Sequence, residues 1–334
     1  MSKFIIITSI YEPSKAVYEF SKKSGWNLVV VGDRKTPKNW SVPGVVYLSL
    51  QDQIDDFQNL TLPENIYARK MFGYLYAIRK GATLIAESDD DNVPYDFWGK
   101  YDDIFKQNGR TKISSPSYTW INIYSFFSKV SPLWPRGFPL DLVLSKNPNN
   151  SIDSEFESNI GVIQQLADGD PDVDAIYRLT KNEPVIFERG KNGIVLQGRG
   201  ICPINSQNTF FRQDVFALMY LPVYVNFRVT DILRGYVISV VCNYIGIDIA
   251  YDGATVFQER NEHDFLNDFE SEMPLYTDIK KLPALLEGLI HETHEESDAP
   301  ITAIIRTVYK GLLRHGWIKS EELVTLNQWL TYFE

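Results

Sequence analysis

The sequence TLIAESDDDN, at residues 83–92, places three consecutive carboxylates directly after a short apolar segment. The apolar part has the composition of a buried strand, and the carboxylates would repel one another unless a cation lay among them. A strand that ends in Asp-x-Asp at the edge of an α/β sheet can hold a divalent cation against a diphosphate. An acidic turn that caps a following helix would use the same residues, so the stretch alone leaves both interpretations open.

Strand and helix patterns alternate from the N-terminus to this stretch. Compact apolar runs at 4–8 and 26–32 are typical of buried strands. Apolar residues at helical spacing follow at 13–24 and again at 63–81, where the second helix would start at a proline and end at a glycine. Such alternation predicts an α/β fold built on a parallel sheet.

Polar side chains follow three of the predicted strands. Thr8 and Ser9 come after the first strand, Asp33 after the second, and Asp89–Asp91 after the third. Ligands of open α/β sheets bind beyond the carboxyl ends of the strands, so these groups could together hold a nucleotide diphosphate. Arg69, on the preceding helix, could contact the same ligand, although a solvated helix face is the simpler interpretation for it.

The composition is that of a globular enzyme without a nucleic-acid partner. Of the 334 residues, 44% are hydrophobic, which is enough for one large core or two modest ones. The formal net charge is −10, and twelve acidic but only three basic residues lie between 259 and 300. Nucleic-acid binding needs a basic face, so we expect no such partner.

The few histidines and cysteines restrict the kind of metal that the chain could bind. No histidine occurs in the first 262 residues, and Cys202 and Cys242 are the only cysteines. A metal in the N-terminal part would therefore need oxygen ligands, which favours Mg²⁺ or Mn²⁺ over zinc. No apolar stretch reaches the roughly 18 residues of a membrane span, and no signal-peptide pattern is present, so we expect a soluble cytoplasmic protein.

Two segments in the middle of the chain have unusual charged sequences, and the first suits recognition of a phosphate or carboxylate. The sequence WPRGFP at 134–139 excludes regular secondary structure and would hold Arg136 in a rigid loop, although an ordinary surface loop is the alternative. The sequence DGDPDVD at 168–174 contains Asp172 and leads into a predicted helix. Its acidic residues could equally stabilise the start of that helix.

Two later segments have side chains that could bind a hydroxyl compound or take its proton. The amides in NSQNT at 205–209 both donate and accept hydrogen bonds, as sugar hydroxyls require, but ordinary loops contain them too. Thr230 or Asp231 could cap a helix that includes the apolar run to Ile247. A carboxylate there could be a general base or only a cap, and Arg234, one turn later, could keep it ionised.

Seven of these motifs occur together in one order: VVVGD at 29–33, RKxxGYL at 69–75, the carboxylates at 89–91, WPRGxP at 134–139, GDPDVDAIxRL at 169–179, NSQNT at 205–209 and RxxDxxRGY at 228–236. In this order they resemble the STELLO glycosyltransferase family, over roughly residues 4–245. A weaker similarity, mainly in the first 115 residues, is to the reversibly glycosylated polypeptides that act as sugar-nucleotide mutases.

The resemblance implies a GT-A-like domain with a mixed, mainly parallel sheet that binds a nucleotide sugar. The donor is expected to be UDP-linked, the cofactor Mn²⁺ or Mg²⁺, and the acceptor a glycan or other hydroxyl compound. We predict this domain at 1–255 and an acidic helical C-terminal region at 256–334. A sugar-nucleotide mutase, a nucleotidyltransferase and a catalytically silent scaffold that retains the donor pocket are the alternatives.

Together, the motifs and the resemblance predict roles for individual residues. Asp91 and Asp89 are expected to bind the cation, and Asp231 to take the acceptor proton if the enzyme inverts configuration. The residues expected to bind the donor nucleotide are Thr8, Ser9, Asp33, Arg69, Asp89 and Asp90. Those expected to bind the acceptor or the sugar are Arg136, Asp172, Asn205, Gln207, Asn208 and Arg234.

Overall fold

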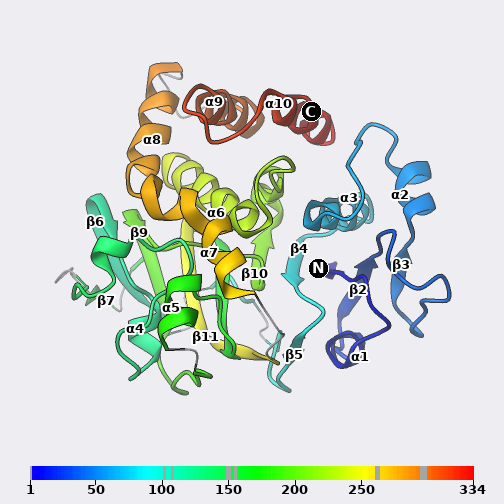
Figure 1. The fold of residues 1–334 in the computed structure, drawn as a ribbon, viewed down its shortest axis with the longest axis horizontal. Helices are drawn as coiled ribbons and strands as arrows, with labels where there is room; N and C mark the ends of the chain where they lie inside the picture. The colour runs from blue at the N-terminus through cyan, green and yellow to red at the C-terminus, as the bar shows by residue number, and fades with distance from the viewer. Residues whose placement is uncertain are drawn as a thin grey trace.

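The structure is a computed structural model, and Figure 1 shows its fold. It describes residues 2–100, 103–106, 109–147, 152–153, 156–181, 183–259, 264–293 and 299–334.

The N-terminal part is a parallel βα unit, as the alternating patterns predict. Its strands lie in the order β3-β2-β1-β4, and all neighbours in this group run parallel. The strands are β1 (Lys3–Thr8), β2 (Trp26–Val31), β3 (Val46–Leu48) and β4 (Leu84–Ser88). The helices of this part are α1 (Lys15–Ser21), α2 (Leu50–Asp56) and α3 (Lys70–Arg79). The carboxyl ends of β1, β2 and β4 therefore meet at one edge of the sheet.

Helix α3 packs unusually close to this sheet because Gly73 has no side chain. A Cβ atom at Gly73 would lie 2.4 Å from Cγ2 of Ile6 and 2.8 Å from Cγ2 of Val31. Any larger residue would push the helix away from β1 and β2. The close packing brings the first residues of α3 near the end of β4, where the carboxylate run begins.

The sheet continues past β4 with strands of mixed direction. Strand β10 (Asn208–Arg212) is antiparallel to β4, with Asn208 opposite Ser88. Beyond it the order is β8-β11-β9-β6-β7, and β5 pairs with β11. These strands are β5 (Asn92–Pro94), β6 (Thr111–Trp120), β7 (Ile152–Asp153), β8 (Ile160–Gly169), β9 (Ile194–Ile201) and β11 (Asp248–Gln258). The predicted α/β class with a mixed, mainly parallel sheet is confirmed.

The predicted C-terminal helical region is also confirmed, and it packs on the long central helix α6 (Phe227–Tyr244). In Figure 1, α8, α9 and α10 lie together along one side of the molecule, next to α6. The C-terminal helices are α7 (Phe265–Thr277), α8 (Leu282–Thr293), α9 (Ile301–Arg314) and α10 (Ser320–Leu330). Across the described part of the chain, no helix combines the length and apolarity that a membrane crossing would need.

These C-terminal helices share the core of the sheet domain. One hydrophobic cluster contains both Phe4 of β1 and Leu330 of α10. The buried Glu322 of α10 accepts hydrogen bonds from the backbone N–H groups of Val223 and Tyr224, each at 2.8 Å. Strand β11 also continues across residue 255, and one hydrophobic cluster spans both regions. The division of the chain at residue 255 therefore stays a prediction.

Two predicted helix starts are wrong. The helix expected from residue 63 begins as a 3₁₀ turn at Tyr67–Arg69 and becomes α3 only at Lys70. Neither Thr230 nor Asp231 caps α6, because the Asn226 side chain accepts a hydrogen bond from Arg228 N at 3.0 Å and starts the helix one turn earlier. The start at Asn226 places Asp231 inside the helix, so its side chain is available for another role.

The packing of α10 makes a direct stability prediction. Trp329 is fully buried, and its Nε1 donates to the carbonyl of Ala217 at 2.9 Å. We expect Trp329→Ala to lower the free energy of unfolding by about 3–5 kcal/mol, because it leaves a large cavity. Val324 on the same helix is 62% exposed, so Val324→Ala should cost less than about 0.5 kcal/mol. Urea denaturation measures both values, and equal losses would contradict this packing.

Candidate active site

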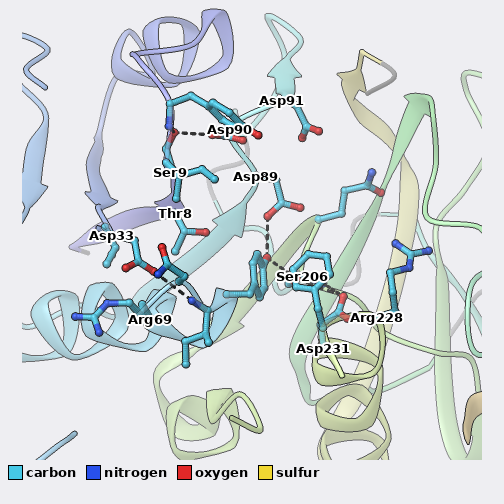
Figure 2. A pocket seen from close by; sticks show the side chains of 18 of the residues that line it. Thr8, Ser9, Asp33, Arg69, Asp89, Asp90, Asp91, Ser206, Arg228 and Asp231 are labelled. Atoms are coloured by element: carbon cyan, nitrogen blue, oxygen red, sulfur yellow. Dashed lines mark hydrogen bonds between the residues drawn. The ribbon is translucent and has the colours of Figure 1, made fainter. Parts of the chain in front are cut away.

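A cleft of about 400 Å³ lies beyond the carboxyl ends of β1, β2 and β4, facing the first turns of α6. Figure 2 shows that its walls come from segments far apart in the sequence. The predicted site residues that line it are Thr8, Ser9, Asp33, Arg69, Asp89, Asp90, Asp91, Arg136, Asp172, Gln207 and Asp231. The cleft therefore lies where the sequence predicts it, beyond the carboxyl ends of the parallel strands.

The three consecutive carboxylates each have a different hydrogen-bond partner. Asp90 accepts from Ser9 Oγ at 2.5 Å, which ties the ends of β4 and β1 together. Asp91 accepts from Gln258 Nε2 at 3.0 Å, and Asp89 Oδ1 accepts from Tyr67 OH at 2.7 Å. The run is followed by strand β5, so the interpretation as a helix cap is wrong.

Placing these carboxylates side by side has an electrostatic cost. Burial, together with the charge of Asp89, raises the pKa of the Asp91 carboxyl to about 7. Burial also raises the pKa of Asp90, against the hydrogen bond from Ser9, which lowers it. A bound cation would remove this cost by neutralising the negative charge. Within the described ranges, no three His, Cys, Asp or Glu side chains are already grouped as a metal cage.

Lys70 contacts the first of the three carboxylates, although it was not among the predicted site residues. Its side chain is fully buried, and Nζ donates to Asp89 Oδ1 at 2.9 Å and to the carbonyl of Ser88 at 2.7 Å. The interpretation of the neighbouring Arg69 as part of a solvated helix face is wrong, since Arg69 is also buried. In the sequence, the feature that could have indicated this contact is the position of Lys70 at the start of the helix that leads into β4.

Arg69 and Asp33 shape the wall of the cleft near β2. Arg69 donates to Gln53 Oε1 at 2.9 Å from Nε and to the carbonyl of Leu62 at 3.1 Å from Nη1. Asp33 accepts from the N–H of Arg34 at 2.7 Å and from the N–H of Ile66 at 3.2 Å. Both side chains thus hold the loops that line the cleft.

Arg136 joins two carboxylates on the opposite wall, and the interpretation of its segment as a surface loop is wrong. The guanidinium is 6% exposed and contacts Asp172 at 2.7 and 3.0 Å and Asp231 at 2.9 and 3.1 Å. Burial alone would raise the pKa of the Asp231 carboxyl, but the charge and hydrogen bonds of Arg136 hold it below its usual value. Asp231 is therefore ionised at neutral pH.

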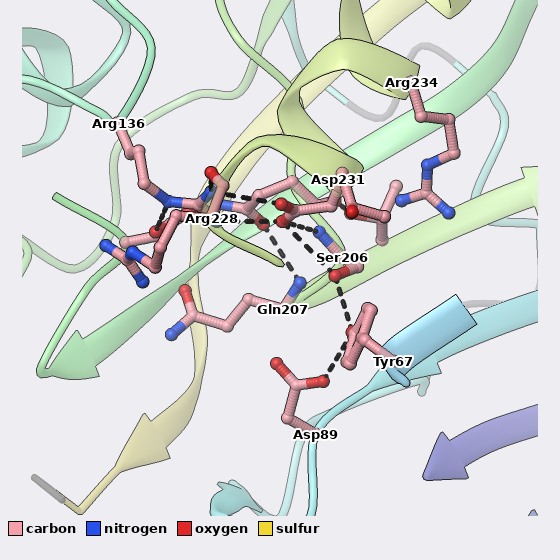
Figure 3. Close-up of polar contacts among 12 residues, drawn as sticks. Tyr67, Asp89, Arg136, Ser206, Gln207, Arg228, Asp231 and Arg234 are labelled. Atoms are coloured by element: carbon pink, nitrogen blue, oxygen red, sulfur yellow. Dashed lines mark hydrogen bonds and ion pairs between the residues drawn. The ribbon is translucent and has the colours of Figure 1, made fainter. Parts of the chain in front are cut away.

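The antiparallel pairing of β10 with β4 brings the NSQNT segment to the cleft. Because Asn208 lies opposite Ser88, the residues before 208 lie beside those after 88. Gln207 and Ser206 consequently line the cleft. Ser206 donates from its N–H to Asp231 Oδ2 at 3.3 Å, which joins this segment to α6 (Figure 3).

Three residues predicted to contact the acceptor or the sugar lie behind the cleft wall. Asn208 is fully buried and donates to Thr255 Oγ1 at 2.8 Å, while Asn205 accepts from the N–H of Gln207 at 3.0 Å. Arg234 is fully buried and bonds both oxygens of Glu87. None of the three lines the cleft as described, so this geometry gives no support to a direct contact with the sugar. The main partner of Asp231 is Arg136 rather than the expected Arg234.

Several residues that were not among the predicted site residues also line the cleft, including Asp170, Arg178, Arg228 and Gln258. Arg228 donates from Nε to Glu272 Oε1 of α7 at 2.7 Å. Arg228, Asp170 and Arg178 belong to motifs already quoted, so the signal for them was present. Nothing local in the sequence marks Gln258 or Glu272, because each acts through a partner more than 40 residues away.

The sequence is similar to two proteins of Arabidopsis thaliana. STELLO2 is 32% identical and STELLO1 31% identical over 250 residues, and both are named probable glycosyltransferases. The match covers 70% of this chain and 32% of each relative, so the chain spans about a third of the length of the curated relatives it matches. A scan against models of protein families finds no match.

Solved structures show only remote likeness. Glucosyl-3-phosphoglycerate synthase from Mycobacterium tuberculosis, solved with Mn²⁺, UDP and glucosyl-3-phosphoglycerate, has a TM-score of 0.42 and 7% identity, covering 84% of this chain and 79% of that one. Residues 1–349 of S. aureus TarS with UDP-GlcNAc have a TM-score of 0.36 and 13% identity, covering 99% of this chain and 79% of that one.

Proposed function

This chain is STELLO-like, and we propose from this premise that it is a glycosyltransferase that moves a sugar from a nucleotide-sugar donor to a hydroxyl of an acceptor. The observation that carries the proposal is that the carboxylates that follow β4 line the same cleft as Asp231 and Arg136. One wall has groups suited to a diphosphate with its cation, and the other has an ionised carboxylate suited to a hydroxyl.

The donor side fits a divalent cation bound mainly by oxygen. Asp91 and Asp89 are the proposed ligands, and their carboxylates line the same cleft. Mg²⁺ and Mn²⁺ are commonly bound by one or two carboxylates together with substrate phosphates and waters, so a complete protein cage is not required. When bound, the cation would neutralise the diphosphate as it leaves the sugar. This fit supports Mn²⁺ or Mg²⁺ as the cofactor.

The nucleotide is proposed to lie between the ends of β1 and β2. Thr8, Ser9, Asp33 and Arg69 line that part of the cleft, and Asp90 is fixed to Ser9. Hydroxyl, carboxylate and guanidinium groups there can bond the ribose, the base and the phosphates. A UDP-linked donor is the expectation that follows from the STELLO-like sequence.

Asp231 is proposed to act at the acceptor. Its carboxylate is ionised and lines the cleft, so it could accept the proton of an attacking hydroxyl if the reaction inverts configuration. If configuration is retained, the same carboxylate would orient the acceptor, with Arg136, Asp172 and Gln207 beside it. The stereochemistry of the product distinguishes these two roles.

We further propose that residues 1–255 perform the transfer and that residues 256–334 support them. Glu272 of α7 is fully buried and bonds Arg228 on the acceptor side of the cleft. Its other oxygen accepts from the N–H of Ala175 at 2.9 Å, at the start of α5 (Ala175–Thr180). One C-terminal carboxylate thus fixes two segments beside the cleft.

Donor turnover should depend on a divalent cation. A panel of UDP-sugars incubated with the protein and MnCl₂ should release UDP from at least one donor. Excess chelator should lower the rate at least about a hundredfold, because the leaving diphosphate would lose its neutralising charge. Addition of MnCl₂ or MgCl₂ beyond the chelator should restore the rate.

Product analysis in the same assay separates the alternatives. A rearranged sugar nucleotide formed without acceptor would indicate a mutase, and release of pyrophosphate would indicate a nucleotidyltransferase. Binding of UDP-sugar without any turnover would indicate a silent scaffold. Full turnover in excess chelator, with no metal in the purified protein, would contradict the proposed cation site.

A further inference from the structure

A line of three oxygen–oxygen contacts runs across the cleft from Asp89 to Asp231 (Figure 3). Tyr67 OH lies 2.7 Å from Asp89 Oδ1 and 2.6 Å from Ser206 Oγ, and Ser206 Oγ lies 3.3 Å from Asp231 Oδ2. Two hydroxyl groups therefore connect the donor-side carboxylate to the acceptor-side carboxylate. We call Tyr67 and Ser206 the hydroxyl bridge.

The hydroxyl bridge has too few hydrogens for its contacts. Tyr67 and Ser206 each supply one hydroxyl hydrogen, and ionised carboxylates supply none. Lys70 also donates to the Tyr67 oxygen, so that oxygen is already an acceptor. Three contacts thus share two hydrogens, and at any moment one contact must lack a hydrogen bond.

Three arrangements of the hydrogens are possible. In the first, Ser206 donates to Tyr67 and Tyr67 donates to Asp89, so the Ser206–Asp231 contact has no hydrogen. In the second, Tyr67 donates to Ser206 and Ser206 donates to Asp231, so the contact with Asp89 has none. In the third, Tyr67 donates to Asp89 and Ser206 donates to Asp231, so the Tyr67–Ser206 contact, at 2.6 Å, has none. The two short distances at Tyr67 and the long one at Asp231 match the first arrangement.

The surroundings let the hydrogens turn without moving the side chains. The Tyr67 ring is fixed between Lys70 Nζ, 4.5 Å from its centroid, and the ring of Phe227, 5.7 Å away and nearly perpendicular. Ser206 is 3% exposed and its N–H bonds Asp231. Only rotation of the two hydroxyl groups is needed to change from the first arrangement to the second.

We propose that the hydroxyl bridge couples the two sides of the cleft: when a donor with its cation takes up the charge of Asp89, Tyr67 turns its hydrogen to Ser206, which then donates to Asp231. This inference rests on the proposed function for the identity of the ligand at Asp89. Tyr67 and Ser206 are positioning residues in it. The consequence is ordered binding, in which the donor fixes Asp231 before the acceptor arrives.

A double-mutant cycle read by calorimetry tests this coupling. The probe is UDP with MnCl₂, titrated into wild type, Ser206→Ala, Tyr67→Phe and the double variant. Ser206→Ala should weaken binding about fivefold, because the tyrosine hydrogen loses its alternative acceptor and one hydrogen bond is lost. In the Tyr67→Phe background, the same substitution should change affinity by less than about 1.5-fold, since the connection is already broken.

The opposite results are equally clear. An equal effect of Ser206→Ala in both backgrounds would mean that Ser206 contacts the ligand directly, and no effect in either would mean that no coupling exists; both overturn the proposal. Tyr251→Phe is the matched control, because Tyr251 is buried and its hydroxyl donates to the carbonyl of Cys202 at 2.7 Å. We expect its affinity for the probe to equal that of wild type.

Failure of the proposed function would be visible separately. If wild type does not bind UDP with MnCl₂, the donor assignment is wrong, and urea unfolding of the same four proteins then decides whether the bridge exists. The bridge predicts that the double variant loses less than the product of the two single losses in the unfolding equilibrium constant, by about threefold or more. Independent effects of the two substitutions would overturn it.

Discussion

Replacing Asp91 by Asn is expected to lower sugar-transfer turnover at least about a hundredfold without lowering the stability of the protein. The substitution keeps the side-chain volume but removes one of the two proposed cation ligands. Burial and the charge of Asp89 raise the pKa of Asp91 to about 7, so its charge at pH 8 opposes folding. The neutral amide removes that cost, and the melting temperature at pH 8 should stay level or rise.

The sign of the pH effect follows from the raised pKa. The folded-state pKa of Asp91 lies above its unfolded value, so the destabilising charge is present above about pH 7 and disappears as the pH falls through that value. Any gain in melting temperature from Asp91→Asn should therefore be larger at pH 8 than at pH 5. Differential scanning calorimetry at the two pH values measures this difference.

A matched control separates the loss of a ligand from the loss of a charge. Asp55 lies exposed on α2, where it accepts a hydrogen bond from Gln51 at 2.8 Å. Asp55→Asn should leave both turnover and melting temperature within error of wild type. Wild-type turnover in Asp91→Asn would instead move the cation site away from this carboxylate.

The second large effect is expected at Asp231, where Asn should lower turnover on the order of a hundredfold. The amide keeps the hydrogen-bonding shape, but it cannot accept a proton from the acceptor hydroxyl. It also leaves the buried Arg136 with one carboxylate partner instead of two, so some stability should be lost as well. Donor affinity is measured in the same preparation, and a change of less than about threefold would place the defect at the acceptor step.

Asp172 provides the comparison that isolates the base. Its carboxylate also pairs with Arg136, and both of its oxygens are engaged, as in Asp231. Asp172→Asn removes an equivalent charge from Arg136 and should cost only about tenfold in turnover if Asp231 is the base. Equal losses in the two variants would show that Asp231 acts by holding Arg136 in place.

The sequence alone was enough to locate the proposed donor side of the cleft. Alternating strand and helix patterns require a parallel sheet, and parallel strands present their carboxyl ends at one edge. Thr8, Ser9, Asp33 and Asp89–Asp91 each follow such a strand directly. Their convergence depends only on local periodicity and chain direction, which the sequence determines.

The proposed acceptor side depends on contacts that local sequence does not encode. The antiparallel register of β10 against β4 places Ser206 and Gln207 in the cleft and turns Asn208 into the core. The pairing of Arg234 with Glu87 withdraws Arg234 from the site, and Asp231 is left to Arg136. The two charge pairings depend on which distant charge a buried side chain meets, since a buried charge must be paired. Only the tertiary structure decides that partner.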